Sequence, residues 1–424
     1  MNDLTQLILA QVVDAFSASA RREEFNGISA KALVSANSDE STVRRVLKVL
    51  VREGQCNCTF ASVHINPAIK RQTDLNVDDQ VNLLRSEELS HMSVYPSRAI
   101  MEVALEPIEF VDRPFTRELA LATAQLEFVG FELAVIDRYT QDPNYKVEFN
   151  DYMGHLGVCD AAYLSGEFPS KDKIGLQKFG LGFGENKHPC IVVFYRYLAD
   201  LTAEHQQYWK SYKIDGLVNI TEQYYQSSFE GKFWENRSAR YGLTQEIMLI
   251  NTMTEAIWGN RLFRTHEFPT GAASITAFSR PTRENLNNFI HTLDKMLSEN
   301  IQKTFFRMFP GLEGQSGKDR TSKQNKGTIT LLRDWLQSEG RWESVKAVDE
   351  VIIKPIREIR NLRQKPAHIL EANDYSVEYY KDRKRLLWGA FNSLSNIRAF
   401  LSRHPKASHV EVPEWLDSGR VDVF

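Results

Sequence analysis

The sequence has no run of about 18 consecutive apolar residues, the length at which a segment becomes a candidate membrane-spanning helix. Its first residues also lack a basic start and a small-residue cleavage site, and Asp3 and Gln6 interrupt the first apolar segment. These absences argue against a membrane protein and against a secreted one. We therefore expect a protein of the cytoplasm that has no membrane partner.

Cysteine is scarce, with four residues in a chain of 424: Cys56, Cys58, Cys159 and Cys190. Their number and spacing do not make a disulfide framework, so we expect reduced thiols. The histidines at positions 155, 188, 205 and 266 lack the spacing of zinc ligands. Neither residue type predicts a metal ion or another cofactor.

One set of residues has the composition of a magnesium-dependent nuclease site, namely Glu185-Asn186-Lys187 with Asp172 upstream. Such sites place the carboxylate and the lysine on a hydrophobic strand, whereas glycines and an asparagine surround them here. The glycines between Gly180 and Gly184 also lack the spacing of a phosphate-binding turn, and we interpret this segment as a flexible loop. A metal-dependent nuclease is therefore kept only as an alternative.

The net charge is small, −3 from 52 basic and 55 acidic side chains, which argues against a protein that coats nucleic acid. The basic residues are nevertheless unevenly distributed. From Lys354 to Lys365 five basic residues face one acidic residue, and a second basic run extends from Lys381 to Arg385. A solvated helix face would have the same pattern, so the basic runs indicate nucleic-acid binding only in combination with the motif beside them.

The length and the composition, 42% hydrophobic and 25% charged, predict a globular protein of two or three domains. We predict a mainly α, multidomain fold. Its four predicted parts are an N-terminal domain at 1–71, a linker with a central α+β domain at 72–280, a helical bundle at 281–405 and a C-terminal arm at 406–424. Trp415 is expected to dock that arm.

Apolar periodicity in the N-terminal part predicts helices over 2–19, 29–36 and 42–53. The alternating residues of 56–60, followed by Val63 and Ile65, indicate a two-stranded wing. Three helices and a wing resemble a winged helix-turn-helix. That resemblance implies that the third helix contacts DNA or a protein partner, and the basic residues of its outer face are Arg44, Arg45, Lys48 and Arg52.

The central part is mixed in character and shows no resemblance to a known family. Its pattern predicts a helix over 117–139 and a buried strand over 189–195, where the sequence reads PCIVVFY. Aromatic residues are dense between Tyr208 and Trp258. We interpret them as core, and a surface that stacks RNA bases is the alternative. The role of this domain stays open.

The C-terminal part predicts four helices, over 282–308, 328–336, 341–364 and 375–404. The third of them carries the basic run and ends in IRNLRQKPAH. At a helical period Arg363 continues the buried stripe of Ile352, Ile356 and Ile359, and Pro366 ends the helix near Gln364. We therefore expect Arg363 and His368 to share one helix-end turn. A structural interpretation is also open, in which Arg363 caps helix carbonyls and His368 packs in the turn.

An arginine followed after four residues by a histidine, between two long helices, resembles the signature of HEPN domains. The resemblance implies a four-helix bundle that dimerises across the motif and, in many members, a metal-independent ribonuclease of a toxin–antitoxin or antiviral defence system. By position Arg363 and His368 match the signature pair. Gln364 takes the polar position that more often holds Asn, Asp or His.

The implied chemistry suits these residue types. Cleavage of RNA by its own 2'-hydroxyl needs two proton transfers, which imidazole performs near neutral pH, and a cation to stabilise the phosphorane. The expected RNA contacts around the motif are Arg360, Lys365, Lys384 and Arg385. Two functions stay open: a dimeric, metal-independent endoribonuclease, and a non-catalytic DNA-binding regulator or adaptor that dimerises through its bundle.

Overall fold

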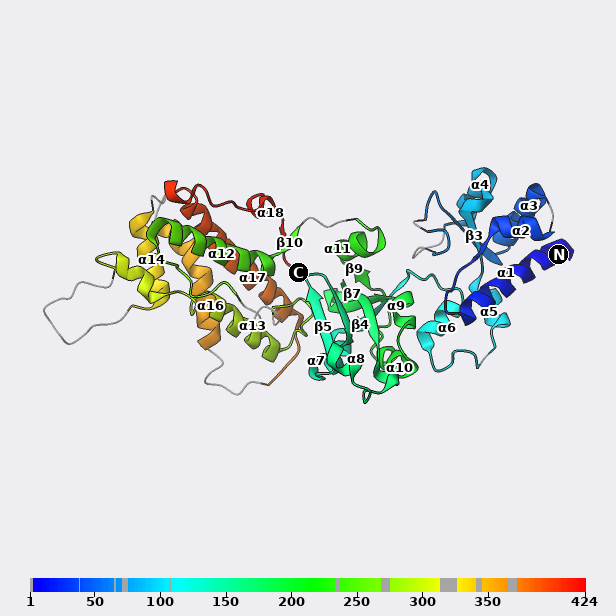
Figure 1. Cartoon of the computed structure of the whole chain (residues 1–424), viewed down its shortest axis with the longest axis horizontal. Coiled ribbons are helices and arrows are strands. Elements are labelled where there is room, and N and C mark those ends of the chain that lie inside the picture. Colours follow the sequence, from blue (N-terminus) through cyan, green and yellow to red (C-terminus); the bar gives the residue numbers. More distant parts are fainter. Residues whose placement is uncertain are drawn as a thin grey trace. The chain divides into compact units, whose positions relative to one another are not determined.

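The computed structural model describes residues 3–37, 39–64, 66–70, 75–106, 108–232, 236–267, 275–312, 326–340, 345–364 and 372–424. The fold is mainly α with some sheet, as predicted. The chain divides into two compact units, residues 1–233 and residues 234–424 (Figure 1). The sequence predicted boundaries at 71, 280 and 405 instead. No helix among the described residues has the length and apolar character needed to cross a membrane.

Three helices open the first unit close to their predicted positions: α1 (Asp3–Arg21), α2 (Ala30–Asn37) and α3 (Glu40–Arg52). Asp39 caps α3, because its carboxylate accepts a hydrogen bond from the Thr42 N–H at 3.0 Å. Ile8 of α1 and Leu47 of α3 are fully buried in one shared core. The periodic apolar positions of the sequence therefore identified these helices correctly.

The predicted pairing within the wing is wrong. Strand β2 (Cys56–Phe60) pairs with β3 (Met92–Pro96), and β1 (Ile28–Ser29) pairs with the other edge of β3. The chain turns after Phe60, whose carbonyl accepts the N–H groups of Val63 and His64, and Ile65 lies outside the described residues. Helix α4 (Val77–Ser86) stands between the two paired strands in the sequence. The three-stranded sheet therefore reaches Pro96, beyond the predicted limit of 71.

The predicted helix over 117–139 is also wrong. This segment contains the end of α6 (Pro114–Ala120), strand β4 (Phe128–Glu132), a 3₁₀ turn (Leu133–Ile136) and the start of α7 (Asp137–Gln141). Ala122, at φ 62°, has the left-handed backbone that ends the helix. Pairing of β4 with the buried strand β8 then decides the conformation of 128–132, which local periodicity does not encode.

The first unit is completed by a six-stranded sheet of order β4-β8-β7-β6-β5, with β9 beside β7. Its other strands are β5 (Tyr145–Asn150), β6 (Met153–Val158), β7 (Gly175–Phe183), β8 (Pro189–Phe194) and β9 (Asn219–Ile220). The predicted strand at 189 is confirmed. The predicted flexible loop is wrong, because Gly180 and Gly182 belong to β7. Gly180 packs against the Tyr224 ring, which leaves no room for a Cβ atom at this position.

A buried polar network joins three segments of the first unit, at Tyr139, at Asp172 and at residues 205–209. Tyr139 and His205 are fully buried, and the Tyr139 hydroxyl lies 2.7 Å from His205 Nδ1. His205 Nε2 lies 3.3 Å from Asp172 Oδ1, and the Trp209 indole N–H donates to the Tyr139 hydroxyl at 3.0 Å. Burial, followed by the charge of Arg138, lowers the pKa of His205.

We expect acid to weaken this network. The folded-state pKa of His205 lies below its unfolded value of about 6.5, so the unfolded chain takes up the proton first. Stability from neutral His205 is present above that pH and is lost as the pH falls through the folded pKa. Urea unfolding of the intact chain and of His205→Gln at pH 8 and pH 5 measures the effect. An equal loss on acidification in both proteins would contradict it.

The second unit is a helical bundle that begins earlier than predicted. Helix α12 (Ala239–Trp258) was assigned to the central domain from the sequence, yet it packs along α17 and shares the bundle core. The other main helices are α13 (Arg283–Met296), α14 (Thr328–Glu339), α16 (Lys354–Gln364) and α17 (Val377–Leu401). A short α15 (Val345–Val348) and a π turn (Asp349–Ile353) lead into α16.

The predicted helix over 282–308 is interrupted, because α13 ends at Met296 and a 3₁₀ turn follows at Lys303–Met308. Ile301, between these two segments, forms an antiparallel bridge with Phe263 after α12, and the Asn300 side-chain amide donates to the Thr265 carbonyl at 2.8 Å. Extended backbone at 300–302 is needed for this bridge. Tertiary pairing therefore ended a helix that the apolar periodicity alone would have continued.

The predicted C-terminal arm is docked on the bundle. It contains a short helix α18 (Glu414–Asp417) and strand β11 (Val421–Asp422), which pairs in parallel with β10 (Arg237–Ser238). The Trp415 ring lies 5.5 Å from that of Tyr241. As predicted, Trp415 docks the arm, although the arm is less extended than expected.

Candidate active site at the end of helix α16

Arg363 lies in the last turn of α16, on the side that faces α13. Ile352, Ile356 and Ile359 are buried before it, as the sequence predicted, and the Arg363 side chain is 25% exposed. Its guanidinium donates to Asp294 Oδ2 at 2.6 Å and also to Glu299. The inward angle of this arginine is therefore explained by two carboxylates at the end of α13.

Arg360, one turn earlier, binds the same two carboxylates. It donates to Asp294 Oδ2 at 2.7 Å and to Glu299 Oε1 at 3.2 Å. The Asp294 side chain is fully buried and also accepts from the Ser298 hydroxyl, whereas Glu299 is 36% exposed. The hydrogen bond from Arg363 is the largest cause of the lowered pKa of Glu299. Two guanidinium groups and two carboxylates thus form one cluster.

The sequence predicted three motif residues here, and the structure describes two of them. Gln364 is the last residue of α16 and is exposed. His368 lies outside the described residues, as does Lys365, the predicted RNA contact. The expected meeting of Arg363 and His368 in one turn therefore stays a prediction.

His291 is a titratable residue beside this cluster that the sequence reasoning missed. It lies on α13, one turn before Asp294, and is half-buried. Burial lowers its pKa, with further lowering from the charges of Lys295 and Arg363. The i, i+3 spacing to an aspartate on the apolar face of α13 was the available signal. The proximity of His291 to the site depends on Arg363 approaching from α16, and the spacing of residues along α13 does not show this approach.

The two predicted RNA contacts on α17 are engaged within the chain. Arg385 donates to Glu358 at 2.7 Å and to Asp382 at 3.1 Å. Lys384 is half-buried over the Tyr380 ring, and burial lowers its pKa. Arg385 thus contacts α16, and neither residue is bonded to the carboxylate cluster of Arg363.

The predicted DNA-contacting residues of α3 have different environments. Arg44 donates at 2.8 Å to the carbonyls of both Leu84 and Glu87 at the end of α4, and its side chain is only 17% exposed. It therefore ties α4 to α3, and its contact with DNA stays a prediction. Arg45 and Arg52 are exposed and make no ion pair among the described residues.

Lys48 of α3 faces a basic neighbour that the sequence reasoning missed, Arg85 of α4. Burial lowers the pKa of Lys48, and the charges of Arg85, Arg44 and Arg52 add to the effect. Like charges that depress a lysine pKa mark a region without enough counter-charge. Lys48, Arg52 and Arg85 therefore lie near one another on α3 and α4.

The alternative metal site is weakened by the structure. Asp172 is held in the network of His205 and Arg138, and Glu185 lies in a short 3₁₀ turn (Glu185–Lys187). In the part of the chain that the structure describes, no group of three or more His, Cys, Asp or Glu residues is placed to hold a metal. All four cysteines are free, and three of them are buried.

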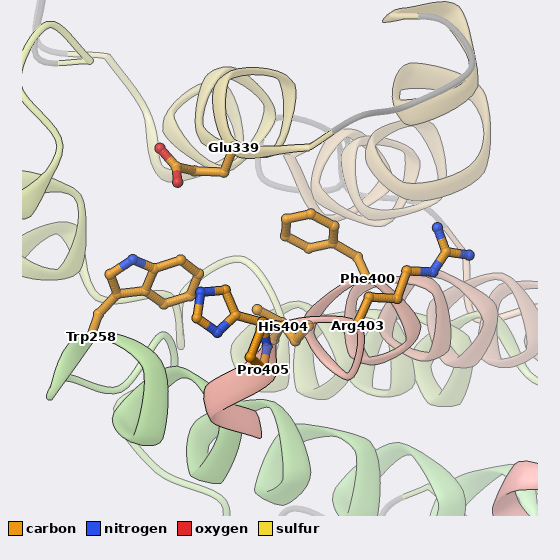
Figure 2. A pocket seen from close by; sticks show the side chains of 7 residues that line it. Trp258, Glu339, Phe400, Arg403, His404 and Pro405 are labelled. Atoms are coloured by element: carbon orange, nitrogen blue, oxygen red, sulfur yellow. The ribbon is translucent and has the colours of Figure 1, made fainter. Parts of the chain in front are cut away.

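A pocket of about 530 Å³ lies at the other end of α17 (Figure 2). Its lining residues include Trp258, Glu339, Phe400, Arg403 and His404. Two contacts show that α16 and α17 run antiparallel. Arg385 bonds Glu358, and Ser393, later in α17, bonds the carbonyl of Val351, which comes earlier in the chain than Glu358. The pocket is thus remote from Arg363 and takes no part in the predicted site.

Comparison of the chain with protein-family models, curated proteins and solved structures finds no match. The function of this chain is therefore inferred from the geometry of the site and from the motif.

Proposed function

We propose that this protein is a metal-independent endoribonuclease of the HEPN type, whose second unit cleaves RNA through attack of the 2'-hydroxyl. One observation carries the proposal: Arg360 and Arg363 of the motif helix converge at a helix end, where the buried carboxylate of Asp294 orients both. The helices α13, α14, α16 and α17 would form the HEPN-like bundle. The N-terminal helices and the sheet β1-β3-β2 support a winged helix.

In this mechanism Arg363 binds the non-bridging oxygens of the scissile phosphate and stabilises the charge that develops on the phosphorane. His368 transfers a proton, either from the 2'-hydroxyl or to the leaving 5'-oxygen. Asp294 is a positioning residue, because it is buried and holds both guanidinium groups. The polar Gln364 follows Arg363 at the exposed end of α16.

The direct test is incubation of the full chain with single-stranded RNA in excess EDTA. We expect cleavage that leaves 2',3'-cyclic phosphate and 5'-hydroxyl ends, since the 2'-oxygen is the nucleophile. Cleavage that needs Mg²⁺ and leaves 5'-phosphate ends would instead favour the alternative site at Glu185 and Lys187.

The proposal includes a homodimer, since one arginine and one histidine per chain make a minimal site and a second copy would double the cationic groups. A role in toxin–antitoxin or antiviral defence and a place in the cytoplasm belong to the same proposal. They follow from the family resemblance.

A second candidate function is a DNA-binding regulator that dimerises through its bundle. Arg45, Lys48, Arg52 and Arg85, which make no ion pair among the described residues, favour it. A protein partner of the same α3 face is the remaining possibility.

We expect Arg45→Ala/Arg52→Ala to weaken duplex DNA binding and to reduce its salt dependence, because binding with fewer phosphate contacts releases fewer counterions from the DNA. The variant Arg21→Ala/Arg22→Ala, which removes two exposed charges elsewhere in the first unit, is the control. Fluorescence anisotropy at several salt concentrations measures both. Arg44→Ala should instead lower stability by about 1–3 kcal/mol through its lost carbonyl bonds. Equal DNA affinity in the original chain, in Arg45→Ala/Arg52→Ala and in the control would assign this face to protein contacts.

A further inference from the structure

A second pocket, of about 480 Å³, lies directly beside the cluster of Arg360 and Arg363. Arg360 and Glu299 form part of its wall, so the pocket adjoins the two carboxylates that bind Arg363. Two more basic residues complete it, Arg264 from the segment after α12 and Lys303 from the 3₁₀ turn after α13. We call this space the basic pocket.

The basic pocket carries more positive than negative charge. Three basic side chains line it and one carboxylate, Glu299, opposes them. Arg264 and Lys303 are exposed and make no ion pair among the described residues, whereas Glu299 is already shared by Arg360 and Arg363. Basic side chains that outnumber the carboxylates beside them attract an anion, and here the excess comes from Arg264 and Lys303.

The backbone holds these residues in place. The Arg264 N–H donates to the Asn300 carbonyl at 2.9 Å, and the Gln302 N–H donates to the Leu262 carbonyl at 2.9 Å. The Thr328 hydroxyl donates to the Ser298 carbonyl at 2.9 Å and so fixes the start of α14 against the same wall. The pocket is thus framed by segments that are bonded to one another.

The lining indicates which part of a ligand is recognised. Besides the charged residues it contains Ser298, Gly327, Thr328, Ile329 and Thr330, and none of the described lining residues is aromatic. Stacking on a nucleobase therefore has no platform here, whereas a phosphate finds cations and hydroxyl groups. Its volume exceeds that of one phosphate and leaves room for the adjoining ribose.

We propose that the basic pocket binds a backbone phosphate of single-stranded RNA next to the bond cleaved at Arg363, and that this phosphate displaces Glu299 from Arg360 and Arg363. The inference rests on the proposed ribonuclease function and adds a substrate subsite to it. In the free protein Glu299 neutralises the arginines that the substrate needs. Asp294, being buried, keeps its bonds when RNA binds.

The test measures binding of the full chain to a short RNA with 2'-O-methyl groups throughout, which has no 2'-hydroxyl to attack. Arg264→Ala/Lys303→Ala removes two cations of the pocket. Lys346→Ala/Arg357→Ala removes two exposed cations of α15 and α16 that do not line it. We expect about tenfold or greater loss of affinity in the pocket variant, from lost charge-assisted hydrogen bonds, and affinity near the original in the control. Equal loss in both would overturn the pocket.

Glu299→Gln tests the displacement. It should bind the same RNA more tightly, because the amide no longer competes as an anion, whereas Glu339→Gln, an exposed carboxylate outside the pocket, should leave affinity unchanged. Unchanged or weaker binding by a folded Glu299→Gln would overturn the role of Glu299.

Inorganic pyrophosphate is the third probe. If it binds as tightly as the RNA, and loses that binding in Arg264→Ala/Lys303→Ala, the ligand is a free anion and the RNA assignment fails. Because none of these arms requires cleavage, an inactive chain with a working pocket would overturn only the ribonuclease proposal. If the original chain cleaves RNA and Arg264→Ala/Lys303→Ala binds RNA with unchanged affinity, only the subsite is overturned.

Discussion

Arg363→Ala is expected to lower RNA cleavage by about 10²- to 10³-fold, the usual effect of removing a group that stabilises transition-state charge. His368→Ala should lower it by about 10²- to 10⁴-fold through the lost proton transfer. Both losses should be the same in EDTA. The measurement is the single-turnover rate per folded molecule with the full chain and single-stranded RNA.

The structure requires a control for Arg363, because this residue also binds Asp294 and Glu299. Arg363→Lys keeps a positive charge beside those carboxylates but loses the planar, bidentate geometry. It should stay folded and remain strongly impaired. If Arg363→Lys cleaves at the original rate, or if Arg363→Ala loses activity only in proportion to unfolded protein, the arginine is structural.

Mixing the two single variants tests the composite site. If Arg363 of one chain acts with His368 of another, a mixture of Arg363→Ala and His368→Ala regains part of the activity, because one of the two sites of a mixed dimer is intact. No recovery, with mixed dimers demonstrated by a tag, would place each complete site within one chain.

The largest expected effect on stability belongs to Glu246 of α12 and Arg398 of α17. Glu246 accepts from Arg398 Nε at 2.8 Å, and their side chains are 0% and 6% exposed. Burial raises the pKa of Glu246 although Arg398 opposes the shift. Removing Arg398 leaves the Glu246 carboxylate buried without its cation or forces its neutralisation. Removing Glu246 leaves the buried Arg398 with only the exposed Asp417, at 3.5 Å.

We therefore expect Arg398→Ala to lower the free energy of unfolding by about 3–5 kcal/mol, and Glu246→Ala by a similar amount. The apolar double variant Glu246→Leu/Arg398→Met should be much more stable than either single variant, because no unpaired charge remains. Urea unfolding measures all four proteins. Additive losses in the double variant would mean that the pair does not act as a unit.

Several local features of this protein are determined by the sequence alone. The apolar period of α1, α3 and α16 predicted those helices, because each buries one face and short-range spacing encodes that face. The β-branched run from Ile191 to Val193 predicted β8, because a strand that is buried on both faces has a continuous apolar sequence. The buried stripe before Arg363 indicated that this arginine turns inward, as it does.

Only the tertiary structure decided which strands pair, which helices pack together and which side chains are in contact. Residues 128–132 are a strand because β8 lies beside them, and β2 pairs with β3 across a long insertion. Helix α12 joined the bundle through its packing on α17. Arg44 bonds α4. Asp294, Glu299, Arg264 and Lys303 lie close to the last two turns of α16. Each of these outcomes depends on contacts between residues far apart in the chain, which the free energy of the whole fold selects and local periodicity does not record.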